Sequence, residues 1–151
     1  MPLKIEIIPR FAEAAEADKL LYVPRHSGAV CHHTKVYHCH VEGNQEAFQT
    51  WIRRVILDET SQDMIVGPQA ARPGAVVLEY GMKPGALDHE REMILDEYRC
   101  EGAADLGFSL NDLKVRTRLY FESAGGEAVD VSPFVRDLVN PAVHAHEVIE
   151  A

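Results

Sequence analysis

A stretch rich in proline and glycine near the middle of the chain separates two parts with the same order of expected elements. Residues 67–74 read GPQAARPG, and two prolines and two glycines so close together are typical of a linker. On each side of this stretch, hydrophobic periodicity predicts strand, helix, strand, helix, strand. We therefore expect two halves, residues 1–67 and 75–151, joined by a linker at residues 68–74.

The repeat is one of pattern rather than of residue identity, and it constrains the architecture. Either half alone is too short to bury much core, whereas two halves that pair their sheets or their helices share one. Helices packed on one face of an antiparallel sheet give an α+β, ferredoxin-like layer. The expected fold is therefore α+β: two tandem ferredoxin-like halves in one compact unit, with an antiparallel sheet and helices on one face.

Several individual elements are predicted by their local pattern. After the N-cap residue Asn44, a helix carries an apolar stripe formed by Phe48, Trp51, Ile52, Val55 and Ile56. A second helix is expected from the cap residue Asp88 to about Cys100. The alternation of residues 113–122 predicts a half-buried strand. Residues 11–21, rich in Ala and Glu, predict a helix, and residues 102–111 predict a loop.

The charge balance excludes several classes of partner. A net charge of −9 and a pI near 5.3 argue against binding to nucleic acid and to anionic membrane surfaces. No apolar run approaches the roughly 20 residues that span a bilayer, and the first residues lack the pattern of a signal peptide. The three cysteines show no CxxC spacing, which favours a reducing compartment. We expect a cytoplasmic protein.

Cationic residues share one face of the strand predicted at residues 113–122. They are Lys114, Arg116 and Arg118, and Lys83 is a candidate neighbour. Because arginine binds carboxylates and phosphates through two parallel hydrogen bonds, this face is a candidate site for a partner's carboxylates or a ligand's phosphate. The alternative is a solvated strand face with no binding role.

Histidines gather on another predicted strand, at residues 30–41. His32, His38 and His40 lie on one face of this strand, and a His-x-His pair on a strand can bind zinc. However, no carboxylate stands at ligand spacing on that face, and the third histidine lies six residues back. The alternatives are therefore a metal site, a polar strand face, or histidines packed at a partner surface.

Three segments of the second half carry motifs that resemble one protein family. In VVLEYGMKPGALDHERE, residues 76–92, the matching positions are Lys83, Gly85, Leu87 and Asp88, whereas His89 and Arg91 depart from the family's Pro and Gly. In LKVRTRLYFES, residues 113–123, Val115 and Arg116 match, while Thr117 replaces Gly and Arg118 replaces Lys. In LVNPAVHAHEVIE, residues 138–150, the matches are Leu138, Asn140 and Pro141.

The family is PurS, the small subunit of formylglycinamide ribonucleotide amidotransferase (phosphoribosylformylglycinamidine synthase). In the first half, KVYHCHVEG and the helix after it resemble the start of the long, fused amidotransferases, whose N-terminal domain resembles a PurS dimer on one chain. The resemblance implies a non-catalytic subunit of purine biosynthesis that docks the synthetase and glutaminase subunits. It implies no catalytic residue and no cofactor on this chain, since ATP, Mg and glutamine are used by the complex.

The resemblance also suggests structural roles for its markers. We expect Gly85 to form a turn, Asp88 to cap a helix, Pro141 to stop a helix and Arg116 to lie at an interface. If the two halves pair internally the chain is a monomer, and if they pair again it is a homodimer. Two other functions remain open: a stand-alone metal-binding protein that uses His32, His38 and His40, and a ferredoxin-like regulatory module for a small ligand.

Overall fold

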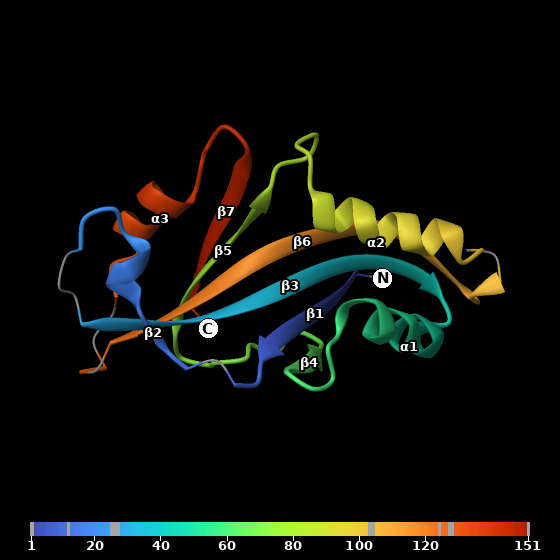
Figure 1. Cartoon of the computed structure of the whole chain (residues 1–151), viewed down its shortest axis with the longest axis horizontal. Coiled ribbons are helices and arrows are strands. Elements are labelled where there is room, and N and C mark those ends of the chain that lie inside the picture. Colours follow the sequence, from blue (N-terminus) through green and yellow to red (C-terminus); the bar gives the residue numbers. More distant parts are fainter. Residues whose placement is uncertain are drawn as a thin grey trace.

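The structure is a computed structural model that describes residues 2–11, 13–24, 28–102, 105–123, 125–126 and 129–150. The elements in chain order are β1 (Pro2–Pro9), β2 (Ala15–Glu16), the 3₁₀ helix η1 (Ala17–Leu20), β3 (Ala29–Gly43), α1 (Gln45–Ile56), β4 (Gln62–Val66), β5 (Val76–Met82), α2 (His89–Cys100), β6 (Phe108–Ser123), α3 (Ser132–Leu138) and β7 (His144–Glu150) (Figure 1). None of the helices in these ranges is both long and apolar enough to cross a membrane.

The strands form one antiparallel sheet that is continuous across both halves of the chain. Its order is β4-β1-β3-β6-β5-β7, and the short β2 adds to β3. The two longest strands, β3 and β6, lie side by side in the middle and pair from Ala29 opposite Ser123 to Gly43 opposite Phe108 (Figure 1). The expected α+β class with an antiparallel sheet is therefore confirmed.

The helices lie on one face of this sheet, in two groups. At one end, α1 and α2 pack with Tyr37 and Cys39 of β3, and at the other end η1 and α3 pack with Cys31 of the same strand. Because side chains alternate across a strand, these odd-numbered residues all point to the same face. The helices therefore cover one face of the sheet at both ends, and no helix covers the other face within the described residues.

An aromatic cluster joins α1 of the first half to α2 and β6 of the second. The ring centroids of Phe48 and Phe108 lie 5.3 Å apart, and those of Trp51 and Tyr98 lie 5.8 Å apart. The predicted apolar stripe of α1 buries Phe48, Trp51 and Ile52 in this cluster. The two halves thus share one core here, as expected from the shortness of each half.

Two sequence predictions fail at the level of elements. Residues 11–21 do not form an α-helix but the short β2 and η1, because Ala15–Glu16 pair with β3. After this pairing, Ala17, Leu20 and Leu21 pack against the core. Residues 102–111 are not all loop, since β6 begins at Phe108. His40 pairs with Asp112 but Val41 pairs with Leu110, so a β-bulge interrupts the alternation that marks the rest of the strand. Residues 12, 103 and 104 of these predictions lie outside the described residues.

The linker crosses the face of the sheet that the helices leave open. It leaves β4 beyond β1 and enters β5 beyond β6, so it passes over the central strands. Lys4 Nζ donates to Gln69 O (2.5 Å), and the amide of Ala71 donates to the Tyr120 hydroxyl (3.2 Å). The linker therefore works as a cover for the middle of this face, and the parts beside it stay accessible.

Candidate functional site

The three segments that carry the family motifs meet at one end of the sheet. Lys83 Nζ donates to Pro141 O (2.5 Å), and the Lys83 amide donates to Val143 O (2.8 Å). A pocket of about 400 Å³ opens between the turn after β5 and strand β6, and its lining includes Lys83, Gly85, Asp88, Lys114 and Arg116. Residues that are up to 58 positions apart in sequence are thus brought to one surface.

The structural roles expected for the markers hold for the residues that form the turns. Gly85 has φ +87°, a left-handed conformation that glycine adopts without strain, in the turn between β5 and α2. Asp88 caps α2, because its Oδ1 accepts from the Arg91 amide (3.1 Å). Helix α3 ends at Leu138, just before Asn140 and Pro141. The marker Leu87 is 62% exposed beside the same turn.

Arg91, which stands where the family pattern has Gly, fills part of this pocket. Its Nε donates to Leu113 O (2.7 Å), and its Nη2 lies 3.3 Å from Asp112 Oδ1. This side chain therefore ties the start of α2 to β6. Arg91 thus contributes to the lining of the pocket.

The predicted cationic face is divided by the linker into an accessible part and a buried part. Lys114 is exposed and Arg116 is half-buried, and neither side chain hydrogen-bonds or forms an ion pair with the residues that the structure describes. Arg118 is only 7% exposed. The expectation that Arg118 belongs to the same accessible surface is wrong, because the linker covers this part of β6.

Arg118 belongs instead to a buried polar network. Its Nε and Nη2 donate to Glu79 Oε1 (2.9 and 2.7 Å), and its Nη1 donates to the Tyr120 hydroxyl (3.1 Å). Tyr120 donates to Glu6 Oε2 (2.5 Å), which also accepts from the Thr34 hydroxyl (2.6 Å). The chain of bonds runs across strands β3, β1, β6 and β5.

The two carboxylates of this network have different partners. Burial by itself raises the pKa of Glu79, but hydrogen bonds from His38 and Arg118, with the charge of Arg118, outweigh it and lower the pKa to about 2. Glu6 Oε1 accepts no hydrogen bond, yet it lies 3.7 Å from Lys4 Nζ and 3.6 Å from Arg118 Nη1. The loss of any one partner from such a buried group of charges would leave another charge buried without compensation, which destabilises the fold.

The partners of Arg118 were not identified from the sequence, although a signal for them exists. Glu6 and Glu79 are single acids inside otherwise apolar strands, in IEII and VVLEY. A charged residue in such a position is rarely buried unless it is paired. Glu79 lies on β5 next to β6, and Glu6 lies on β1 two strands away, so the alternation of one strand does not reveal either acid as a partner of Arg118.

The three predicted histidines do not meet. His38 Nε2 lies 3.2 Å from Glu79 Oε2, while His32 Nε2 lies 3.9 Å from Glu122 Oε2 at the other end of β3. Six residues of a strand span about 20 Å, which is too far for one metal ion. Within the described ranges, no three His, Cys, Asp or Glu side chains are grouped to hold a metal.

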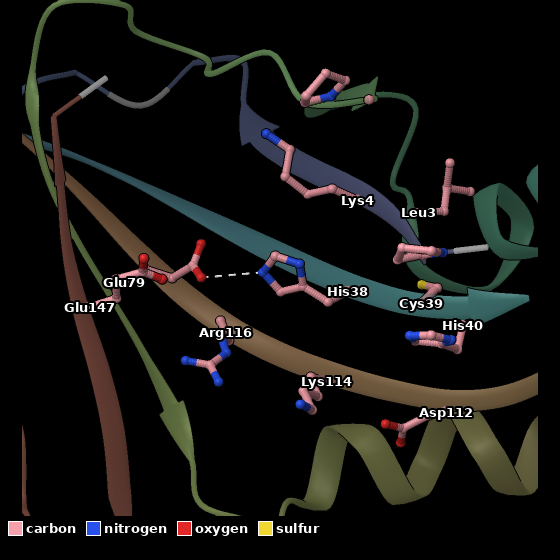
Figure 2. Close-up of a pocket in the computed structure, with 13 residues that line it drawn as sticks. Leu3, Lys4, His38, Cys39, His40, Glu79, Asp112, Lys114, Arg116 and Glu147 are labelled. Carbon is pink, nitrogen blue, oxygen red and sulfur yellow. Dashed lines mark hydrogen bonds and ion pairs between the residues drawn. The ribbon is translucent and has the colours of Figure 1, made fainter.

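A second groove, of about 590 Å³, lies on the open face of the sheet next to the linker (Figure 2). It shares Asp112, Lys114 and Arg116 with the pocket at the turn, and His38 links it to the buried network. Cys39 borders the groove on β3, but its side chain belongs to the core on the helix face, where burial raises the pKa of the thiol to about 12. The lining combines cations (Lys4, Lys114 and Arg116) with carboxylates (Glu79, Asp112 and Glu147).

Comparison of the chain with protein-family models, with curated proteins and with solved structures finds no match.

Proposed function

We propose that this chain is a non-catalytic, PurS-type subunit of phosphoribosylformylglycinamidine synthase that docks the synthetase and glutaminase subunits in purine biosynthesis. The observation that carries the proposal is the convergence of the motif segments. Lys83, Gly85 and Asp88 from the first segment line the same pocket as Val115 and Arg116 from the second, and Lys83 bonds to Pro141 of the third. Residues that share a surface can share a partner.

The strand order supports the finer proposal of two tandem ferredoxin-like halves. The first half supplies β4, β1 and β3, and the second supplies β6, β5 and β7, so the order of the second half mirrors that of the first across the central pair. Such an arrangement resembles two PurS-like units that pair through their longest strands on one chain. A rigid sheet of this kind would hold two partners at a fixed distance.

The surface around the pocket has the composition of a docking site. Met82, Leu87 and Val143 are 41%, 62% and 37% exposed, and they lie on or beside the turn that carries Lys83. Apolar side chains ringed by cations suit a partner surface with apolar anchors and carboxylates. We place the contact with the synthetase subunit here.

Complex formation tests this proposal. The purified chain is mixed with a synthetase subunit that lacks its own N-terminal domain, with ATP, Mg and glutamine present, and is analysed by size-exclusion chromatography. We expect co-elution, and we expect Leu87→Asp to weaken the complex at least tenfold, because it places a charge in the contact. Val23→Asp is the matched control, since Val23 is 70% exposed on the loop after η1.

Two results would count against the proposal. One is the absence of a complex between the folded wild-type chain and the synthetase subunit at micromolar concentrations. The other is a complex that Leu87→Asp and Val23→Asp weaken equally. Circular dichroism of both variants shows whether either change has unfolded the chain.

A further inference from the structure

A row of basic side chains crosses the open face of the sheet, and it extends beyond the pocket at the turn that the docking proposal uses. Strand pairing places Lys4 of β1 opposite His38 of β3, and His38 opposite Lys114 of β6. Arg116 follows two residues along β6 on the same face, and all four side chains line one groove (Figure 2). Lys4 and Lys114 flank His38 from the two neighbouring strands, and Lys114 and Arg116 share one face of β6, so the groove gathers several cations in one place.

Two of these cations, Lys114 and Arg116, form no ion pair in the described part of the chain, although the Glu147 carboxylate also lines the groove. Glu79 is occupied by Arg118, and Asp112 lies against Arg91. Lys4 Nζ reaches the linker at Gln69 O. Lys114 and Arg116 make no hydrogen bond or ion pair with the described residues, although acidic residues outnumber basic ones and give the protein a net charge of −9.

Beside Arg116, the neighbouring strand β5 carries a residue without a side chain. Gly81 of β5 lies opposite Arg116, and a Cβ at Gly81 would come within 3.0 Å of Arg116 Cγ and 2.7 Å of Val115 O. Its partner on β7 is the small residue Ala145. The groove, at about 590 Å³, falls in the range of roughly 300–1,000 Å³ that small-molecule sites occupy.

We propose that this groove binds the phosphate group of a small molecule. Arg116 supplies the planar pair of donors that matches phosphate, Lys114 supplies a second charge, and His38 and His40 flank them. A long polyanion is disfavoured, because the protein as a whole is acidic. Glu147, at the β7 side of the groove, suits the hydroxyl or amino groups of the same ligand.

The test uses inorganic phosphate and pyrophosphate as probes at constant ionic strength, with sodium chloride as the reference. Calorimetric titration gives the affinity, and thermal unfolding gives the stabilisation that binding confers. We expect pyrophosphate to bind and to raise the melting temperature of the wild type above the chloride reference. Lys114→Gln and Arg116→Gln should each weaken binding about tenfold or more, and the double variant should lose it.

Matched controls and a stability measurement separate binding from folding. Lys19→Gln and Arg53→Gln remove exposed cations elsewhere and should leave pyrophosphate binding unchanged. Without pyrophosphate, the double variant should be about as stable as the wild type, because neither Lys114 nor Arg116 forms a hydrogen bond or ion pair with the described residues that the changes would remove.

Three results would overturn the proposal. The wild type shows no stabilisation by phosphate or pyrophosphate beyond that of chloride, the double variant keeps the effect, or citrate binds more tightly than pyrophosphate. The proposal does not rest on the docking function. Leu87→Asp should leave pyrophosphate binding intact, so failure of either proposal can be recognised without the other.

Discussion

The buried network around Arg118 shows how single side chains fix the centre of the sheet. Arg118, Glu79 and Glu6 are almost fully buried, and their charges compensate one another through hydrogen bonds and close ion pairs. Removing one member of such a group leaves an uncompensated charge behind, which is more costly than the pair itself is stabilising. The network therefore stabilises one arrangement of β1, β3, β5 and β6 under the linker.

Glu79 should make the stability of the protein depend on pH in the acidic range. Its pKa falls from an ordinary value of 4.5 to about 2 on folding, so its stabilisation is complete above pH 4.5 and is lost as the pH falls towards 2. Glu79→Gln mimics the protonated form and should lower the free energy of unfolding by about 3 kcal/mol at pH 7. Urea unfolding at pH 7, 4 and 3 measures the difference.

The difference between the wild type and Glu79→Gln should shrink steadily as the pH falls. Glu42→Gln, a change at an exposed acid near the end of β3, is the matched control and should have little effect at any of these pH values. A difference that is the same at pH 3 and pH 7 would contradict this role of Glu79.

Among the secondary-structure elements, those whose conformation depends on residues close in sequence were predicted correctly. The stripe of α1 and the caps Asn44 and Asp88 were predicted, because a helix start depends on neighbours three residues away. Residues 11–21 were predicted wrongly because pairing of Ala15–Glu16 with β3 overrides a helix preference. The start of β6 was missed because the bulge breaks its alternation, and the register that creates the bulge is not a local property.

The cap of α2 provides a prediction at this scale. Asp88→Ala should lower the free energy of unfolding by about 1 kcal/mol, because the Arg91 amide loses its acceptor. Asp88→Asn keeps a capping oxygen and should lose much less. Chemical denaturation of the two variants and the wild type compares them, and equal losses for Ala and Asn would show that the charge of Asp88, not its cap, stabilises the helix.

In the whole molecule, the two halves that the sequence pattern suggests are joined into one sheet with a common core. The halves share the β3–β6 pairing, the aromatic core of α1 and α2, and the buried network beneath the linker. The candidate site was predictable in part, since motif residues pointed to Lys83 and Arg116, and the alternation of residues 113–122 pointed to Lys114. The groove was not, because it depends on which residues stand opposite one another on five strands.

We expect both halves to unfold in one transition. Trp51, the only tryptophan of the chain, reports on the first half by fluorescence, while far-UV circular dichroism reports on the whole. Leu119→Ala should destabilise the chain by about 2–4 kcal/mol from the far end of β6, and should move both midpoints equally. A fluorescence midpoint that stays in place while the dichroism midpoint moves would show that the halves unfold independently.

The most direct test of the proposed function is reconstitution of glutamine-dependent amidine formation from the synthetase and glutaminase subunits of the same source. The reaction is followed with and without this chain, and with the Leu87→Asp variant in place of the wild type. The docking role predicts that activity requires the chain, and that Leu87→Asp restores it only at much higher concentration. Full activity without the chain would contradict the proposed function.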